Sequence, residues 1–256
     1  MDAAPLQSLQ HWLAAAAINA ALIAAASRVP LLTPAGWAHA AALGTVLWGC
    51  MGPAGWLAVV AYLALGSLVT RLGFAAKAAR GLAEARGGRR GPENVWGSAA
   101  TGALLALLMP LVNEAQHAVL LVGFAASFAA KLADTFGSEI GKRWGKHTVL
   151  ITSLRPVAPG SEGAISLEGT AASLVGGLLM AVICAGLGLL HGLPSGTAGT
   201  LGTITLVTVV ALLATLLESV IGATLQQRCA WLSNELVNAL QTALAALLAM
   251  AVVVLL

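Results

Sequence analysis

Long apolar segments alternate with short polar ones along most of the chain. Residues 169–190, 192–217 and 236–256 carry no formal charge, and each is long enough to cross about 30 Å of hydrocarbon as an α-helix. Residues 29–70 also lack Asp, Glu, Lys and Arg, and the glycine- and proline-containing segment 49–55 interrupts them. Such a segment is typical of a tight turn, so the pattern predicts a helical hairpin over 29–70.

Three further apolar segments complete the pattern. Residues 12–27, 95–112 and 116–133 raise the expected number of transmembrane helices to about eight. With 59% hydrophobic and 9% charged residues, the composition excludes an ordinary soluble domain. We therefore expect an all-α, polytopic membrane protein that forms a single integral-membrane domain over residues 1–256.

The basic residues predict the orientation in the membrane. Of thirteen Lys and Arg residues, eleven lie between Arg71 and Arg155. By the positive-inside rule their loops face the cytoplasm, which puts the loops at about 71–94, 132–168 and 218–234 inside and both termini outside. The N-terminus lacks the basic region of a signal peptide. We expect a bacterial inner or internal, thylakoid-type membrane, with the active site facing the cytoplasm.

Cysteine and histidine offer little chemistry. Cys50, Cys184 and Cys229 have neither metal nor redox spacing, and we interpret them as small apolar side chains. No second ligand stands at metal spacing to His117 or His147. We interpret all five histidines as non-catalytic.

The first polar segment with candidate chemistry is a glycine-rich basic turn at 87–98. It contains Arg89 and Arg90 and leads into an expected helix. Backbone N–H groups at a helix start, with arginines beside them, can hold phosphate oxygens. A positive-inside loop that contacts anionic lipid would have the same composition, and that alternative stays open here.

The second segment is 133–143, where charged residues follow an apolar span. Ionisable residues beside a membrane segment are costly and are functional candidates by default. If the segment is helical, Asp134 and Ser138 share one face and Glu139 and Lys142 another. Either carboxylate could hold Mg²⁺ against phosphate oxygens. The alternative is a structural ion pair with Lys131, Lys142 or Arg143.

The third segment, 152–170, is rich in proline, glycine and hydroxyl groups. It predicts a shaped loop whose amides and hydroxyls can form an anion-binding nest. A plain connecting loop would seldom combine the side chains found here before an apolar helix, which are Arg155, Ser161, Glu162, Ser166 and Glu168. The segment contains no Walker motif.

A fourth, smaller polar cluster lies at 218–238. Glu218, Gly222 and Gln226 recur every fourth residue, which would place them on one helical face. With Gln227, Asn234, Glu235 and Asn238 they would complete the pocket from other helices. Polar packing between helices explains the cluster equally well.

Several strings in these segments resemble a known integral-membrane family. They are Gly88-Arg89-Arg90-Gly91-Pro92, Ala133-Asp134-Thr135 with Ser138-Glu139-Ile140-Gly141, Gly160 with Glu162-Gly163-Ala164-Ile165-Ser166, and Glu218-Ser219 with Asn234-Glu235 and Asn238. The resemblance is to the family that contains phytyl-phosphate kinase of photosynthetic organisms and animal transmembrane protein nineteen. It covers nearly all of the chain from Arg71 onward, and the strings around Arg89 and Glu162 look like the photosynthetic branch.

The resemblance implies a phosphotransferase that converts phytyl phosphate, or a related isoprenoid monophosphate, to the diphosphate. The donor would be CTP or another nucleoside triphosphate, and the product would serve phytol salvage into tocopherol and phylloquinone. Asp134 and Glu139 are then the expected Mg²⁺ ligands, with Ser138 and Arg155 as further catalytic residues. The expected phosphate- and nucleotide-binding residues are Arg89, Arg90, Lys142, Arg143, Gly160, Glu162, Gly163, Ser166, Gln226, Asn234 and Asn238.

Two other functions fit parts of the pattern. A lipid nucleotidyltransferase also places Asp-Thr near a glycine-rich segment, and it would release pyrophosphate. A cation-coupled transporter could bind its cation at Asp134, although transporters place such groups near the bilayer midplane. The expected partners are an isoprenoid phosphate, a nucleotide and the lipid bilayer, with no nucleic acid.

Overall fold

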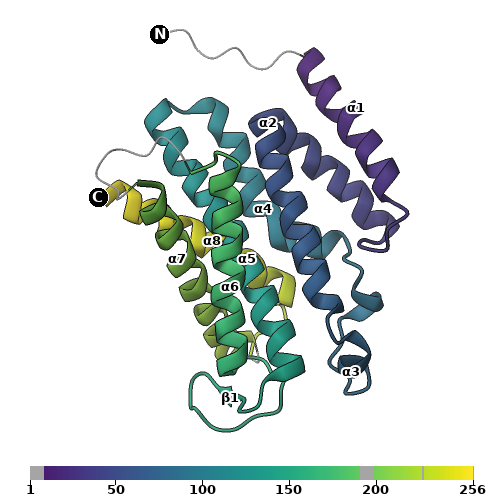
Figure 1. Ribbon diagram of the computed structural model, residues 1–256, viewed down its shortest axis with the longest axis vertical. Helices are drawn as coiled ribbons and strands as arrows, with labels where there is room; N and C mark the ends of the chain where they lie inside the picture. Colours follow the sequence, from purple (N-terminus) through teal and green to yellow (C-terminus); the bar gives the residue numbers. More distant parts are fainter. Residues whose placement is uncertain (1–8, 191–198, 227, 256) are drawn as a thin grey trace.

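The chain folds into long helices that run between two ends of one bundle (Figure 1). The computed structural model describes residues 9–190, 199–226 and 228–255. The elements in chain order are α1 (Leu9–Ala26), α2 (Pro34–Arg71), α3 (Phe74–Ala78), η1 (Ala85–Gly88), α4 (Pro92–Leu108), η2 (Met109–Leu111), α5 (Glu114–Trp144), β1 (Val149–Leu150), β2 (Ala164–Ile165), α6 (Leu167–Gly186), α7 (Gly199–Ile221), η3 (Gly222–Gln226) and α8 (Asn234–Leu255).

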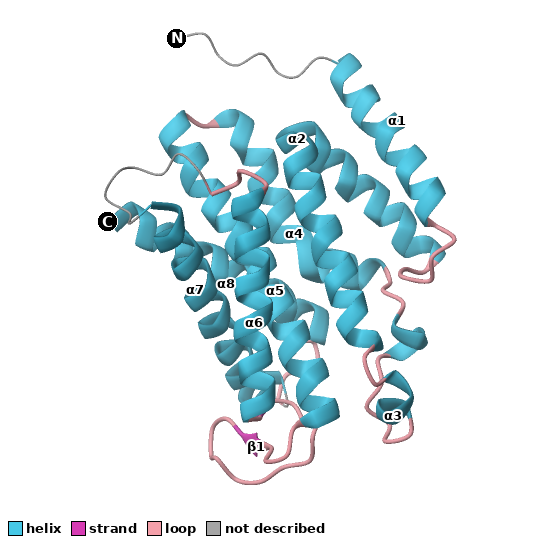
Figure 2. Cartoon of the chain, in the orientation of Figure 1, coloured by secondary structure: helices cyan, strands magenta, loops and turns pink. Residues whose placement is uncertain are grey.

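The predicted all-α class is confirmed. Seven of the described helices are long and apolar enough to cross a membrane. Strands within the described residues are limited to β1 and β2, a short antiparallel hairpin in the loop after α5 (Figure 2). The chain is therefore a multi-pass integral membrane protein.

Helix α2 is the predicted helical hairpin. Its 38 residues would extend about 57 Å if straight, but the backbone turns at Gly52, whose φ of 66° favours glycine. The rings of Trp48 and Trp56 meet edge-on at 5.7 Å between centroids, although a straight helix would separate these positions by about 12 Å along its axis. If the two halves of α2 are counted separately, the described residues contain the expected eight spans.

Helix α5 forms the centre of the bundle. Every residue from 122 to 133 is buried, and α5 packs against α2, α4, α6, α7 and α8. Its contact with α6 is a backbone-to-backbone approach, because a Cβ at Gly169 would lie 3.0 Å from the carbonyl oxygen of Gly137. Small residues at such a crossing let membrane helices pack closely.

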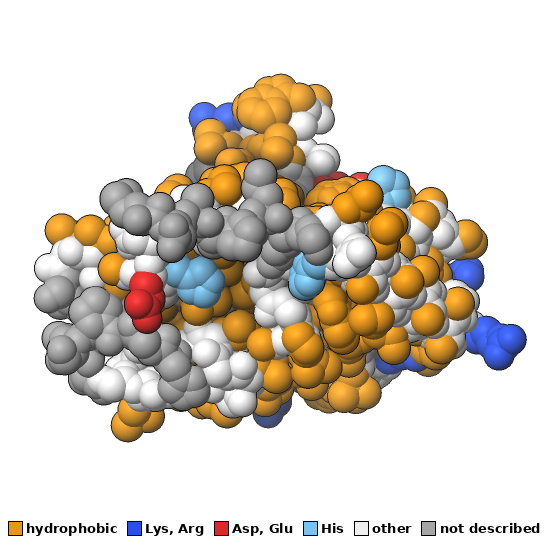
Figure 3. All heavy atoms as spheres, turned by 90° about the horizontal axis from the view of Figure 1, so that it is seen from above, with side chains coloured by type: hydrophobic (Ala, Val, Ile, Leu, Met, Phe, Trp, Pro, Cys, Tyr) orange, Lys and Arg blue, Asp and Glu red, His pale blue; other side chains and the backbone are white. Residues whose placement is uncertain are grey.

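The polar loops gather at one end of the bundle, which we call the basic end. There the turn before α2 meets the segment before α4, since Arg90 N donates to Leu31 O at 3.0 Å and Thr33 N donates to Arg90 O at 3.0 Å. The start of α1 and the end of α8 lie at the opposite end (Figure 1). A view onto that opposite end shows mostly hydrophobic and uncharged surface, with Lys and Arg only at its margin (Figure 3). This separation agrees with the predicted topology.

Two predicted loop boundaries were wrong. Helix α5 does not end near residue 133 but continues to Trp144, so the expected loop at 132–168 begins only after it, because its glycines pack against α6 and do not break the helix. The segment expected at about 71–94 runs from the end of α2 at Arg71 to the start of α4 at Pro92 and contains α3 and η1. The loop at 218–234 is shortened by α7 and η3. The start of the predicted span 192–217 lies outside the described residues as far as position 198, as do Gln227 and Leu256.

Candidate active site

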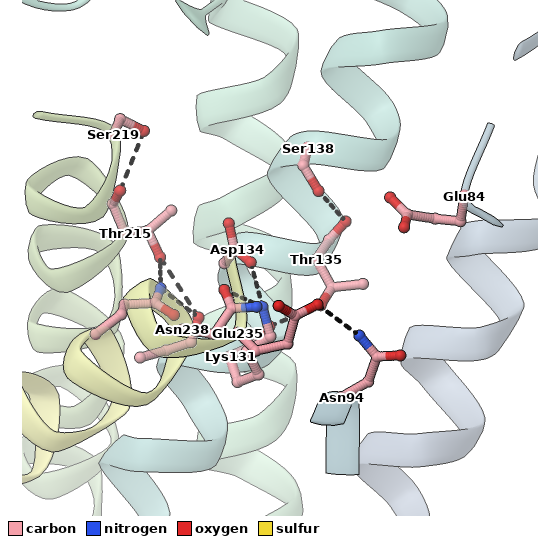
Figure 4. A network of polar contacts seen from close by, with 12 residues as sticks. Glu84, Asn94, Lys131, Asp134, Thr135, Ser138, Thr215, Ser219, Glu235 and Asn238 are labelled. Carbon is pink, nitrogen blue, oxygen red and sulfur yellow. Dashed lines mark hydrogen bonds and ion pairs between the residues drawn. The ribbon is translucent and has the colours of Figure 1, made fainter. Parts of the chain in front are cut away.

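A polar cavity of about 370 Å³ opens at the basic end between α2, α4, α5, α7 and α8. Six of the ten acidic residues and five of the thirteen Lys and Arg residues of the chain line it. We call the side formed by α5, α7 and α8, together with Lys77 that pairs with α5, the helical wall. The side formed by residues 84–90 and 159–166, together with Lys142 that pairs with Glu84, is the loop wall. Figure 4 shows side chains of both walls and of α4 turned toward one another.

The helical wall is organised around Lys131. Its ammonium donates to Asp134 Oδ2 at 2.5 Å and to Asn238 Oδ1 at 2.8 Å, so that it links α5 to α8. Lys131 is 7% exposed, whereas Asp134 keeps part of its carboxylate open to the cavity. Burying a cation is costly without such partners, so this network fixes the position of Asp134.

A second polar layer lies beneath this network. Gln241 of α8 donates to the carbonyl oxygen of Ala130 and to Thr215 Oγ1, both at 3.1 Å. Thr215 in turn donates to Ala211 O within α7 at 2.9 Å. These bonds connect α5, α7 and α8 directly below the cavity and give the helical wall a fixed floor.

A buried ion pair completes the helical wall. Lys77 of α3 is fully buried, and its ammonium pairs with Glu139 of α5, which is 2% exposed. The same ammonium donates to Thr70 O at 2.8 Å. The short helix α3 is thereby tied both to α5 and to the end of α2. Glu139 lines the cavity, but Lys77 already binds its carboxylate.

Exposed ion pairs characterise the loop wall. Lys142 Nζ lies 2.8 Å from Glu84 Oε1, and the side chain of Glu84 is 48% exposed. Partial burial disfavours the charged carboxylate of Glu84, but the ammonium of Lys142 outweighs that cost and lowers the pKa of Glu84. Arg86 pairs similarly with Glu93, and both side chains are exposed. Exposed pairs of this kind are loosely held, so a ligand can compete for these cations.

The segment before α4 carries the predicted arginines. Arg89 lines the cavity and is exposed. Arg90 is held more firmly, because its Nη1 donates to the Tyr62 hydroxyl at 2.7 Å and its guanidinium lies 5.1 Å from the centre of the Tyr62 ring. A Cβ at Gly66 would lie 2.5 Å from Arg90 Nη2. The second half of α2 therefore cradles this guanidinium at the border of the cavity.

The loop after α5 covers the remaining side. Gly160 and Gly163 both have positive φ, and a Cβ on Gly163 would lie 2.6 Å from the carbonyl oxygen of Ser219, so this turn presses against α7. Ser166 Oγ accepts from Gly169 N at 3.1 Å and caps α6. Burial raises the pKa of the Glu162 carboxyl, with Lys142 acting in the opposite direction.

Most of the predicted site residues meet in this cavity. Those that line it are Asp134, Ser138, Glu139, Arg89, Arg90, Lys142, Gly160, Glu162, Gly163, Ser166, Asn234 and Asn238. None of the described histidines lines it. The glycines and Ser166 have a structural reason for their identity, because turns, helix packing and capping require them.

Three predicted residues are not brought to the cavity. Arg155 is exposed on the outer part of the loop. Arg143 lies over the Trp144 ring at 5.0 Å and packs against Gly73. Gln226 belongs to the π-helical turn η3. Its Oε1 lies 3.6 Å from the position that a Cβ would take at Gly222, so Gln226 packs beside Gly222 without lining the cavity.

Several polar residues of the site were not singled out from the sequence. They are Tyr62, Thr70, Lys77, Glu84, Arg86, Ser173 and Thr215. Tyr62 carried a usable signal, because it is the one tyrosine of the chain and stands within an apolar span. Lys77 carried none, because a buried lysine between alanines looks like any positive-inside residue in sequence.

The donor set suits a divalent cation only in part. The described residues contain no group of three or more His, Cys, Asp or Glu side chains arranged for a metal ion. Mg²⁺, however, is commonly held by one or two carboxylates together with substrate phosphates and water. Asp134 fits such a site, with Glu162 and Glu218 lining the same cavity. Glu139 fits it less well because of its pairing with Lys77.

Chemically, the cavity combines cations with hydrogen-bond donors and carboxylates in a partly enclosed space. Cations such as Arg89 and Lys142 can neutralise anionic groups, and the fixed Lys131 network can orient them. The described lining residues include no cysteine or histidine, and the hydroxyls of Ser138, Ser161 and Ser219 donate to main-chain carbonyl oxygens. The arrangement favours chemistry on anionic groups that depends on positioning and charge neutralisation.

Comparison with known proteins places the chain in a wider group. A family model described as integral membrane protein DUF92 matches residues 17–246. An uncharacterized membrane protein of Synechocystis sp. is 48% identical over 243 residues, which cover 94% of this chain and 91% of that protein. Protein VTE6, chloroplastic, of Arabidopsis thaliana is 38% identical over 222 residues, which cover 85% of this chain and 64% of the plant protein.

A more distant relative comes from an archaeon. An uncharacterized membrane protein of Methanocaldococcus jannaschii is 30% identical over 185 residues, covering 72% of this chain and 70% of that protein. No solved structure matches the chain.

Proposed function

The chain belongs to the DUF92 family of integral membrane proteins, and we propose that it is a kinase that phosphorylates phytyl phosphate, or a related isoprenoid monophosphate, to the diphosphate. The observation that carries the proposal is the cavity at the basic end, which collects eleven charged side chains in a protein with 9% charged residues. A site for two phosphorylated substrates needs such a concentration of charge at the membrane surface.

The resemblance to the phytyl-phosphate kinase family supports the choice of acceptor. The sequence strings that carry this resemblance contain Arg89, Asp134 and Glu162, and all three residues line the cavity. The relative from Arabidopsis is named as a chloroplast protein, which suits phytol salvage into tocopherol and phylloquinone. The donor would be CTP or another nucleoside triphosphate.

The proposed step transfers one phosphoryl group. An oxygen of the lipid monophosphate attacks the γ-phosphorus of the nucleotide, the bond from the γ-phosphorus to the bridging oxygen breaks, and nucleoside diphosphate leaves. Such transfer needs mainly positioning and charge neutralisation. Lys131 and Asn238 orient Asp134, while Arg89 and Lys142 hold phosphate oxygens at the loop wall.

Mg²⁺ would neutralise charge between the phosphates, and Asp134 with Glu162 or Glu218 would hold it. Binding of Mn²⁺ in its place can be followed by electron paramagnetic resonance without turnover. We expect Mn²⁺ to bind in the presence of nucleotide and Asp134→Asn to weaken that binding.

The test of function uses purified protein in detergent with Mg²⁺, labelled phytyl phosphate and each of ATP, CTP, GTP and UTP. We expect phytyl diphosphate and nucleoside diphosphate from one or more donors. Pyrophosphate together with a nucleotide-linked lipid would instead identify a nucleotidyltransferase. Absence of both products with all four donors in correctly folded protein would refute phosphotransfer to this lipid.

A further inference from the structure

A second cavity adjoins the polar one and is lined mainly by apolar side chains. This apolar groove of about 480 Å³ lies between α1, the two halves of α2 and the start of α4. Its lining is almost entirely hydrophobic, with Ile23, Leu31, Leu43, Val59 and Leu63 among its residues. Its size lies within the range of small-molecule sites, about 300 to 1,000 Å³.

The two cavities meet at a shared border. Tyr62, Arg90, Asn94 and Ser98 line both of them. The guanidinium of Arg90 is fixed at this border by the Tyr62 hydroxyl at 2.7 Å. An anionic group at the border would therefore meet a positioned cation, and an apolar chain attached to it would continue into the groove.

The groove is accessible from the side of the bundle. Helix α1 stands at the margin and packs against α2 (Figure 1). Leu22, Ala25 and Ala64 line the groove, yet their side chains are exposed on the outer surface. These residues lie in spans that cross the membrane, so the rim of the groove opens toward hydrocarbon and not toward water.

The far end of the groove is closed by polar side chains. Trp56 Nε1 donates to Asn19 Oδ1 at 3.0 Å, and Asn19 Nδ2 donates to Ala41 O at 2.5 Å. Asn19 is 1% exposed. This bonded Asn19–Trp56 pair joins α1 to both halves of α2, and it sets a fixed limit to the length of the groove.

The geometry points to this groove as the site of the substrate's isoprenoid chain, with the monophosphate held at Arg90 and the chain packed into the space that the Asn19–Trp56 pair closes. The inference rests on the proposed function, because it takes a lipid monophosphate as the acceptor. Lipid tails surround the protein, so no hydrophobic gain favours the groove over the bilayer. The shape of the groove therefore determines which isoprenoid chains fit, and its closed end limits the length of chain that it can hold.

The test compares two tryptophan variants across acceptors of increasing chain length, namely geranyl, phytyl and a longer prenyl monophosphate. Trp56→Leu removes the closing side chain and should shift preference toward the longer acceptor. Trp48→Leu is the matched control, because Trp48 contacts the Trp56 ring at 5.7 Å and is half-buried like it, but does not line the groove. We expect the ratio of kcat/KM for the long and phytyl acceptors to rise about tenfold in Trp56→Leu alone.

A second pair of variants narrows the groove. Leu63 and Leu65 are both half-buried on α2, and only Leu63 lines the groove. Because Leu63 follows Tyr62 at the border, Leu63→Trp should lower kcat/KM about tenfold for all three acceptors, and Leu65→Trp should leave these values unchanged. An acceptor preference that is the same in Trp56→Leu and Trp48→Leu, or equal kcat/KM values in Leu63→Trp and Leu65→Trp, would overturn the inference.

Photolabelling of the unaltered protein provides a measurement that needs neither variants nor turnover. A prenyl monophosphate with a diazirine at its chain end should label α1 or residues 34–63, and excess phytyl phosphate should prevent the labelling. Labelling of α6, α7 or α8, or labelling that phytyl phosphate does not displace, would overturn the inference. Displaceable labelling of the groove without any phosphorylation would refute the proposed kinase activity and leave the groove assignment standing.

Discussion

The two walls of the polar cavity use the same kinds of ion pair in opposite environments. In the helical wall, Lys131 is 7% exposed and the Lys77–Glu139 pair is almost fully buried. In the loop wall, the Glu84 side chain is 48% exposed and Arg86 and Glu93 also face solvent. Buried charges are costly to leave unpaired, whereas exposed pairs contribute little. The helical wall therefore fixes geometry, and the loop wall offers cations that a ligand can capture.

The largest effect is expected at Asp134, where the fixed wall meets the cavity. Asp134→Asn keeps the size of the side chain but removes the charge that Lys131 and a bound cation require. We expect kcat to fall about a thousandfold, or about 4 kcal/mol of transition-state stabilisation. Single-turnover kinetics on correctly inserted protein measure this loss.

The control for that variant is on the same helix. Glu114→Gln makes the same chemical change at the start of α5, at the opposite end of the bundle, and should leave kcat within twofold of the unaltered protein. Near-normal activity of Asp134→Asn would remove this carboxylate from the mechanism.

The next effect concerns stability. Lys77→Met leaves Glu139 buried without its cation, which should destabilise the fold by about 3 to 5 kcal/mol. Thermal unfolding in detergent would show the loss, and Lys77→Met combined with Glu139→Leu should restore most of it. Arg80→Met is the matched control, because Arg80 follows α3 closely but is exposed. Equal melting temperatures for the two single variants would contradict the expected difference between a buried and an exposed cation.

At the border between the cavities, Arg90→Lys tests geometry apart from charge. A lysine cannot reproduce the planar contact of the guanidinium with Tyr62. It also lacks a second nitrogen that could donate to a phosphate while the first donates to Tyr62. We expect KM for the lipid phosphate to rise about tenfold, with a smaller change in KM for the nucleotide. Arg71→Lys, at the same end but outside the cavity, should change neither KM. Equal KM changes for both substrates in Arg90→Lys would place Arg90 between the phosphates instead.

The exposed Glu84–Lys142 pair should matter less and should respond to pH. Because Lys142 lowers the pKa of Glu84 in the folded protein, the pair stabilises the fold above the unfolded pKa of about 4.3 and loses this contribution as the pH falls through the folded value. Glu84→Gln should reduce stability by less than about 1 kcal/mol at pH 7. Unfolding at pH 7 and near pH 3 should show that the deficit vanishes in acid.

The smallest effect is expected at Arg155. The side chain is exposed and does not reach the cavity, so Arg155→Lys should leave kcat and both KM values within about twofold, as for an ordinary surface substitution. Steady-state kinetics would decide this. A tenfold loss would show that the loop after α5 brings Arg155 to the substrate during turnover.

The membrane pattern predicted the fold well because its signal is local. An uncharged span and a basic loop can be read from neighbouring residues, so the helices, the hairpin turn at Gly52 and the common end of the polar loops were all expected. Helix ends were less accurate, as α5 shows. Its continuation to Trp144 depends on packing of Gly137 and Gly141 against α6, which no local pattern reveals.

Part of the site could also be predicted, because some of its residues stand out locally in the sequence. Asp134, Arg90 and Glu162 could be found because charges are rare in this chain and because their strings resemble a known family. Lys77 and Thr215 could not, since their role comes from contacts across the bundle. Arg155 was assigned from its proline- and glycine-rich surroundings, which indicate a shaped loop but not the direction of a side chain.

The glycine contact between α5 and α6 has a consequence for motion during turnover. Where a Cβ at Gly169 would already lie 3.0 Å from the Gly137 carbonyl oxygen, one helix cannot rotate past the other without a steric clash, so α5 and α6 should behave as a rigid body that carries Asp134 with it. Substrate binding and product release must then depend on displacement of the surrounding parts, the loop wall on one side and α1 with α2 on the other. Asp134 would then keep its position while the loop wall and α1 with α2 move to admit substrate and release product.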